Sequence, residues 1–178
     1  MTTYEQLATC AGKDGWPGVD VPFLHEVNGE QWSCATDGYA FVAVRGVVDG
    51  VGFVPSLWDV TAFIREGQNG CAFYATALRG FVNPPMDTPV SVKKPRPVLI
   101  DGIRFDANLI ARVLAVVDIG PDEPTIKHDL DLGFGRWLQV AGYGWRIVVV
   151  GDHGPAVKGE VLPSFVSAKT FPGMYKHR

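Results

Sequence analysis

The sequence predicts an α+β fold that combines antiparallel sheets with two short helices. Glycine and proline are frequent, at 21 and 13 of 178 residues, and they divide the chain into segments too short for long helices. Two pairs of β-prone segments flank tight turns, which is typical of antiparallel hairpins. The hydrophobic share of 47% supplies the core of one domain of this length.

The first half of the chain is predicted to contain helices on either side of a hairpin. Residues 3–11 place apolar side chains at helical spacing. Two β-prone segments, residues 31–36 and 39–44, flank Asp37-Gly38, and Asp-Gly between such segments is a strong hairpin signal. The remaining predicted elements of this half are a helix from its N-cap Ser56 to about Glu66 and a strand over Cys71–Leu78.

The second half follows residues 83–97, which contain five prolines and are predicted to form an extended connector. The helix of this half is capped by Asp106 and runs to about Val117. It is apolar nearly all round, which is typical of a buried helix. The other predicted parts are a strand over Val98–Ile103, a hairpin of Arg136–Ala141 and Gly144–Val150, and a tail of residues 152–178.

The two predicted hairpins resemble each other. Each begins with a tryptophan, Trp32 or Trp137, turns at glycine next to tyrosine, and leaves on a valine-rich strand. We therefore expect a single domain over residues 1–178 with two pseudo-repeated halves, at about 1–82 and 98–151, each holding one apolar helix. The alternative is that hairpins look alike because few residue types suit a tight turn.

The first hairpin, Cys34-Ala-Thr-Asp-Gly-Tyr-Ala-Phe-Val-Ala43, resembles one in the bacterial DNA sliding clamps, the processivity subunits of replicative polymerases. The segment from Val98 to Leu114 is similar to that family's strand, Asp-Ala opening and apolar helix. The resemblance covers residues 20–150. It implies one clamp domain, with two β-α-β-β-β halves and helices on one side. A bacterial clamp chain has three such domains, so the resemblance implies a single-domain relative, phage- or plasmid-derived, linked to DNA replication or to host defence or inhibition.

The distribution of charge ranks a protein partner ahead of DNA. Residues 1–89 carry ten acids and four bases, a net −6, whereas residues 90–178 carry nine acids and twelve bases, a net +3. This split favours oriented contacts between unlike surfaces, whereas a nucleic-acid-binding domain is usually basic as a whole. In the DNA-binding alternative the chain assembles into an oligomeric clamp. The cations that would contact phosphates are Lys93, Lys94, Arg96 and Arg112.

The second hairpin supplies the candidate partner-binding residues. Tryptophan, tyrosine and arginine dominate the energetics of protein interfaces when they are exposed. They can also stack on single-stranded bases, or pack inside the sheet. The candidates are Arg136, Trp137, Tyr143, Trp145 and Arg146.

No catalytic centre is visible in the sequence, so we expect a non-enzymatic protein without a cofactor or metal. The competing hypothesis is a small hydrolase, with Asp152-His153 or His128 as its acid–base group. His128 and Asp129 would point to opposite faces of a strand, which weakens a metal site there. The cysteines have neither zinc nor disulfide spacing and are expected to be buried thiols: Cys10, Cys34 and Cys71.

The expected environment is the cytoplasm, without membrane contact. No apolar run reaches the length of a membrane span, and the N-terminus lacks the basic and apolar regions of a secretory signal. We expect a protein partner and a homo-oligomer, since one clamp-like domain leaves sheet edges exposed. Asp122 and Glu123 flank prolines and are expected to be solvated.

Overall fold

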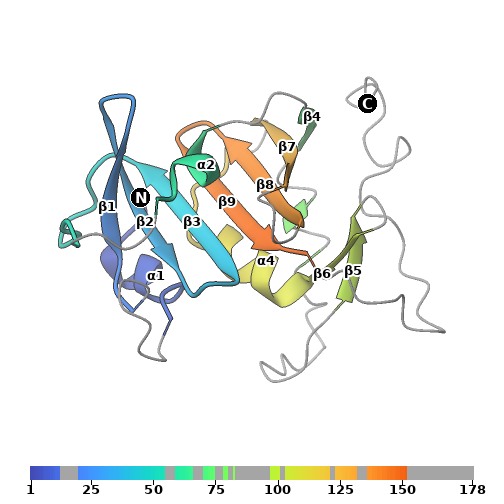
Figure 1. Ribbon diagram of the computed structural model, residues 1–178, viewed down its shortest axis with the longest axis horizontal. Coiled ribbons are helices and arrows are strands. Elements are labelled where there is room, and N and C mark those ends of the chain that lie inside the picture. Colours follow the sequence, from blue (N-terminus) through green and yellow to red (C-terminus); the bar gives the residue numbers. More distant parts are fainter. Residues whose placement is uncertain are drawn as a thin grey trace.

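The computed structural model describes residues 1–12, 20–54, 59–65, 70–74, 78–79, 82, 97–100, 103–120, 123–131 and 136–151. Seven strands form one antiparallel sheet in the order β1-β2-β3-β9-β8-β7-β4, and β5 and β6 form a separate hairpin (Figure 1). The strands are β1 (Phe23–Val27), β2 (Glu30–Thr36), β3 (Ala40–Arg45), β4 (Gly70–Tyr74), β5 (Pro97–Ile100), β6 (Ile103–Asp106), β7 (Pro124–Asp131), β8 (Arg136–Gly142) and β9 (Trp145–Val150). The helices are α1 (Tyr4–Ala8), α2 (Thr61–Ile64) and α4 (Ala107–Leu114). The predicted α+β class, with antiparallel sheets and short helices, is confirmed.

Several element boundaries differ from the prediction: α1 is shorter than residues 3–11, and α4 ends at Leu114 and not near Val117. In place of the helix predicted from Ser56 to about Glu66, the described residues contain the four-residue α2, and the Asp59 carboxylate accepts the N–H of its first residue, Thr61. Residues 98–103 form no single strand, since β5 ends at Ile100 and β6, which begins at Ile103, runs antiparallel to it. The strand predicted to reach Leu78 ends at Tyr74, and Leu78 is helical.

Backbone pairing reveals an internal repeat. Trp32 lies opposite Arg45 in the β2–β3 pair, and Trp137 lies opposite Val150 in the β8–β9 pair. Each residue of the second pair therefore lies 105 positions after its counterpart in the first pair (32 to 137, 45 to 150). The β1–β2 and β7–β8 pairs keep the same shift without a gap. The three-stranded units β1-β2-β3 and β7-β8-β9 therefore have the same register throughout.

The two units meet at the centre of the large sheet, where β3 pairs with β9. Val42 lies opposite Ile147, its own counterpart at the shift of 105 residues (42 to 147), so a pseudo-two-fold axis passes through this pair. A helix precedes each unit, α1 in the first and α4 in the second. The counterpart of α4 is thus α1, and not the helix that we predicted after the first hairpin.

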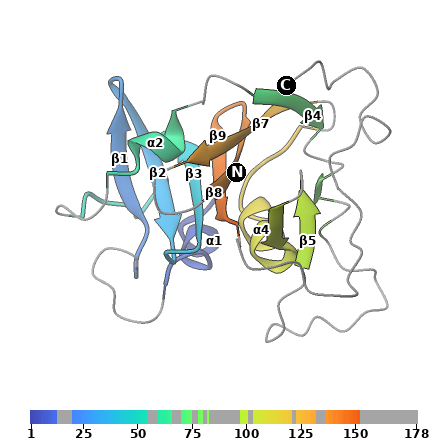
Figure 2. The same ribbon diagram turned by 45° about the vertical axis from the view of Figure 1, so that its right-hand side comes forward.

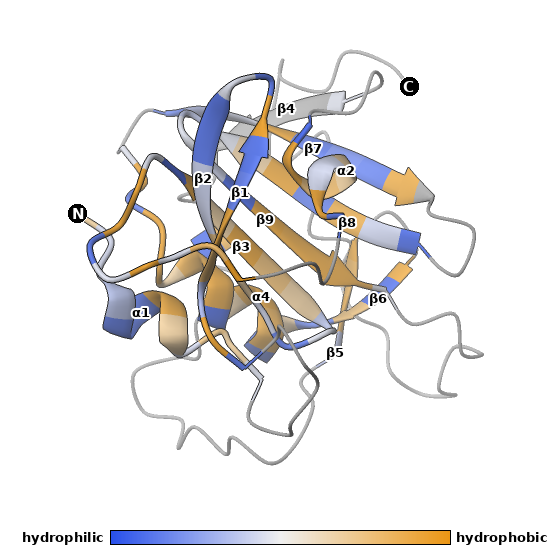
Figure 3. Ribbon diagram, turned by 60° about the vertical axis from the view of Figure 1, so that its left-hand side comes forward, coloured by the Kyte–Doolittle hydropathy of each residue, from blue (hydrophilic) through white to orange (hydrophobic). Residues whose placement is uncertain are grey.

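Both faces of the sheet are covered. The apolar face towards α1 and α4 includes Val42, Val140 and Ile147, and the opposite face, which includes Phe41 and Val148, packs against α2. Figures 1 and 2 show α1 and α4 on the same side of the sheet. Strand β3 is apolar along most of its length, whereas the tip of the β1–β2 hairpin is hydrophilic (Figure 3). The neighbouring strands β9 and β8 each contain one buried polar residue, Arg146 and Gln139. Among the described residues, no helix is long and apolar enough to cross a membrane.

Candidate binding groove

A groove of about 660 Å³ opens at the end of the sheet where the β8–β9 turn lies. Its walls come from three segments far apart in the sequence: residues 1–5 at α1, residues 44–49 at the end of β3, and residues 143–145 of the β8–β9 turn, with Asp118 beside them. Three of the exposed large apolar side chains, Met1, Val47 and Tyr143, line this groove. The groove therefore places part of the predicted partner-binding hairpin on an accessible surface.

Tyr143 is exposed but held in place. It is 85% exposed, while its backbone N–H donates to the Glu123 carboxylate. The Arg45 guanidinium lies 5.8 Å from the centre of its ring and 5.3 Å from the ring of Trp32. Arg45 is itself oriented by an ion pair with Glu30 at 3.4 Å. An exposed aromatic ring fixed in this way loses little conformational entropy when a partner packs against it.

Trp145 forms the floor of the turn and is buried at 2% exposure. Its indole N–H donates to Glu123 over 3.1 Å. A Cβ on Gly142 would overlap the indole ring, with the nearest ring atom 2.0 Å away, so only glycine fits beneath this tryptophan. Glu123 also accepts the Gly120 N–H at 2.9 Å. Our prediction that Glu123 is solvated is therefore wrong, because its carboxylate fixes both the turn and the tryptophan.

Two other predicted partner-binding residues, Trp137 and Arg146, are buried as well. Arg146 is 6% exposed and donates to the carbonyl oxygens of Ile64, Gly142 and Trp145 at 2.7–2.8 Å. These side chains hold the fold together and cannot contact a partner. Of the five candidates, Tyr143 and Arg136 are exposed, but Tyr143 lies in the β8–β9 turn and Arg136 at the opposite end of β8, so they do not form one patch.

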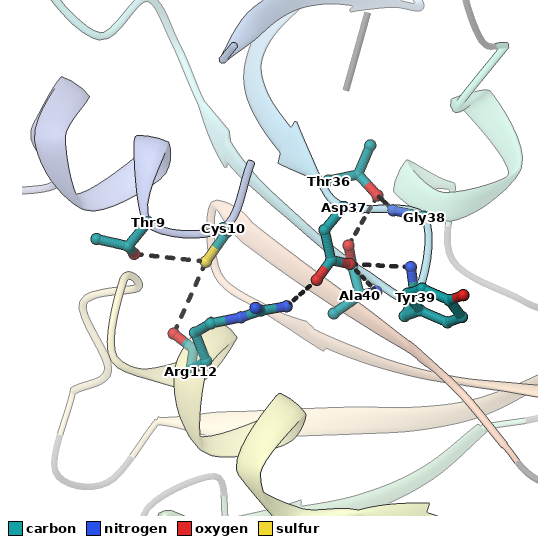
Figure 4. Close-up of polar contacts among 8 residues, drawn as sticks. All are labelled: Thr9, Cys10, Thr36, Asp37, Gly38, Tyr39, Ala40 and Arg112. Atoms are coloured by element: carbon teal, nitrogen blue, oxygen red, sulfur yellow. Dashed lines mark hydrogen bonds and ion pairs between the residues drawn. The ribbon is translucent and has the colours of Figure 1, made fainter. Parts of the chain in front are cut away.

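The candidate phosphate contacts do not form a basic surface in the described part of the chain. Arg112 is paired with the Asp37 carboxylate (Figure 4). The other charged residue of the helices α1 and α4 is Glu5, an exposed acid. Lys93, Lys94 and Arg96 lie outside the described residues. The helices α1 and α4 therefore carry one arginine that could contact DNA phosphates, and its charge is already neutralised by Asp37.

The Asp37–Arg112 pair joins the two repeats. Asp37 Oδ1 accepts the backbone N–H groups of Tyr39 and Ala40, both at 2.9 Å, which closes the β2–β3 turn. Its Oδ2 accepts from Arg112 of α4, in the other repeat. The Cys10 thiol contacts the Arg112 carbonyl oxygen at 3.8 Å, so the end of α1 meets the same point. We interpret this cluster as a structural junction.

The described residues offer no assembled catalytic group. His128 is buried at 3% exposure, and its ring lies over Gly70, where a Cβ would come within 2.5 Å of it. Asp152-His153 lies outside the described residues. The described histidines, cysteines, aspartates and glutamates form no metal-binding cluster. Burial raises the pKa of the Cys10 and Cys34 thiols, so both are poor nucleophiles, and both are buried as predicted, whereas the Cys71 side chain lies outside the description.

One histidine that the sequence did not single out comes close to a catalytic arrangement. His25 Nε2 lies 3.0 Å from Thr61 Oγ1 and 3.7 Å from an Asp59 carboxylate oxygen. In a nucleophilic triad the hydroxyl and the carboxylate bind opposite nitrogens of the ring, whereas here both face Nε2. Hydrogen bonds from the Thr61 hydroxyl and backbone lower the pKa of Asp59, in keeping with a helix-capping role.

Comparisons with known proteins do not identify a family for this chain. No family model matches the sequence, and no curated protein matches it. The resemblance to sliding clamps stays a prediction from the sequence, and the groove around Tyr143 is the feature on which a function can be argued.

Proposed function

We propose that this protein is a non-enzymatic, clamp-like binding module that holds a protein partner in the groove beside Tyr143. The observation that supports this most directly is the combination of exposure and order at Tyr143. The ring is 85% exposed, yet Glu123 holds its backbone and Arg45 lies against its ring. Aromatic anchors of this kind supply much of the affinity of protein interfaces.

The clamp-like part of the proposal is supported by the order of the elements. Each repeat has a helix followed by three antiparallel strands, and a strand, β6, also precedes α4 in the second repeat. Both helices lie on one face of the sheet, as the resemblance implies. In this proposal the chain is phage- or plasmid-derived and acts in DNA replication or in host inhibition by capturing a protein.

Self-association is also part of the proposal. In the large sheet β1 and β4 are the outermost strands. The outer edge of β1 is engaged, since Leu24 N–H donates to the Gly52 carbonyl oxygen at 3.0 Å. We therefore place self-association at β4, where a strand of a second copy would add to the sheet. Light scattering of the purified protein tests this part, and a strict monomer contradicts it.

The experiment for partner binding compares two turn tyrosines. Tyr143 and Tyr39 are exposed at 85% and 65%, at opposite ends of the β3–β9 pair. We expect Tyr143→Ala to lose the protein that the wild type captures from its host, and Tyr39→Ala to retain it. Capture is quantified by mass spectrometry, and unfolding curves confirm that both variants are folded. Equal capture by Tyr143→Ala and the wild type would refute the proposed function.

A further inference from the structure

The groove carries negative charge that the described residues do not balance. Three carboxylates line it, from Glu5, Asp49 and Asp118. Asp118 is paired with the N-terminal ammonium at 2.9 Å. Glu5 and Asp49 are exposed, and no cation of the described residues forms an ion pair with either of them.

The single arginine in the groove does not supply that balance. Arg45 is paired with Glu30, outside the groove, and its guanidinium lies 5.3 Å from the ring centre of Trp32 and 5.8 Å from that of Tyr143. Its charge is thus matched by Glu30, and it also contacts two aromatic rings. The open part of the groove therefore combines two unmatched carboxylates with an apolar surface formed by Tyr143 and Val47.

We infer that the partner segment bound in this groove is cationic, with lysine or arginine next to an apolar or aromatic side chain. This inference rests on the proposed function and specifies its partner. The apolar side chain packs against Tyr143 and Val47, while the cation meets the carboxylates of Glu5 and Asp49. An acidic segment would be repelled by the same carboxylates, so the groove discriminates by charge as well as by shape.

Three fluorescent peptides of equal length test this inference by anisotropy with the full chain. The first alternates lysine with leucine and phenylalanine, the second has glutamate in place of lysine, and the third has glycine in place of the apolar residues. We expect the first to bind at least about tenfold more tightly than either of the others. Its affinity should also fall as salt rises, because exposed ion pairs are screened.

Charge-neutralising variants locate the site. We expect the double variant Glu5→Gln with Asp49→Asn to weaken the lysine peptide about three- to tenfold, the usual effect of losing two exposed ion pairs. The matched control, Asp20→Asn with Glu26→Gln, removes the same charge from exposed positions outside the groove and should change nothing. Unfolding curves verify that both double variants keep the wild-type fold.

The outcomes separate this inference from the proposed function. Tight binding of the glutamate peptide, failure of the lysine peptide to bind, or an unaffected Glu5→Gln, Asp49→Asn variant overturns the inference. If Tyr143→Ala still abolishes capture of the natural partner in that case, the proposed function survives without a cationic partner. If Tyr143→Ala leaves capture intact, the proposed function itself falls.

Discussion

Cys34 lies at the centre of β2 with no exposed surface. Burial raises the pKa of its thiol far above the usual range, because a thiolate there would lose its hydration. The equivalent residue in the second repeat is Gln139 (34 to 139), whose side-chain N–H groups donate to the carbonyl oxygens of Phe63 and Arg65 at 2.6 and 2.9 Å. At this position the first repeat thus has an apolar side chain, whereas the second has a polar one that binds the end of α2.

Because the Cys34 thiol is buried, the free energy of unfolding should decrease at alkaline pH. The folded state keeps the Cys34 proton, whereas the unfolded chain releases it as the pH rises through about 8.5. Stability is therefore lost above that pH, since the unfolded state binds fewer protons. We expect Cys34→Ala to reduce this loss by up to roughly 1.4 kcal/mol per pH unit, as measured by urea unfolding in alkaline buffers. An unchanged slope would contradict this account.

Helix α2 depends on the sheet beneath it. A helix of four residues is not stable alone in water, and its terminal carbonyl groups need donors. Gln139 and Arg146 supply them, and Arg146 also lies 5.1 Å from the Trp32 ring centre. At the first-repeat position equivalent to Arg146, the residue is Phe41 (41 to 146). Gln139 and Arg146 are both in the second repeat, and the residues at the equivalent positions of the first repeat are Cys34 and Phe41. This difference between the repeats explains why a nearly symmetric sheet binds a single helix on this face.

Replacing Arg146 should therefore damage the fold itself. Arg146→Ala removes a charged donor from three buried carbonyl oxygens, and we expect a loss of about 3 kcal/mol in the free energy of unfolding. The neighbouring strand offers a control, since Arg136 is exposed and Arg136→Ala should change stability by no more than about 0.5 kcal/mol. Urea unfolding followed by circular dichroism measures both. Equal stability of the two variants would show that Arg146 is not structural.

Turn chemistry explains which elements the sequence predicted well. Asp37-Gly38 identified the first hairpin, and Asp106 identified the start of α4, because both side chains bond to nearby backbone N–H groups. A comparable signal was missed at Asn28-Gly29, whose φ angles of 53° and 79° make the β1–β2 turn. Short helices such as α2 are harder to predict, since distant residues determine where they end.

The candidate site was only partly predictable for a different reason. Tryptophan and arginine suit both interfaces and sheet interiors, so their identity did not distinguish Tyr143, which is exposed, from Trp145 and Arg146, which are buried. The role of Glu123 depends on a contact between residues 20 or more positions apart. The groove itself could not be predicted, because its three walls meet only through the pairing of β3 with β9.

The molecule as a whole is two units sharing one sheet. The β3–β9 ladder runs through the pseudo-two-fold axis, and the Asp37–Arg112 pair adds a second bridge between the repeats. The apolar cluster on the side of α1 and α4 draws buried residues from both repeats, such as Leu7 and Ile110. Neither unit has a complete core of its own, so the fold should behave as one cooperative body.

Cooperativity can be tested with one tryptophan in each repeat. Trp32 and Trp137 occupy equivalent positions, and both are buried. Fluorine NMR of protein labelled with fluorotryptophan follows each residue separately, with Trp32→Phe and Trp137→Phe used for assignment. We expect both native signals to disappear at the same urea concentration. Two separate transitions would mean that the repeats unfold independently.

The shared sheet also sets an order of events during synthesis. Strand β9 begins 100 residues after β3 ends, from Arg45 to Trp145. At a translation rate of about 5–20 residues per second, the unpaired edge of β3 waits on the ribosome for roughly 5–20 s before its partner is made. During that interval the same edge of another nascent chain is an equally fitting partner, since β3 and β9 are equivalent strands. Strand exchange between chains is therefore expected where ribosomes are closely spaced on one messenger RNA. Slow initiation, which keeps the ribosomes far apart, would protect the product.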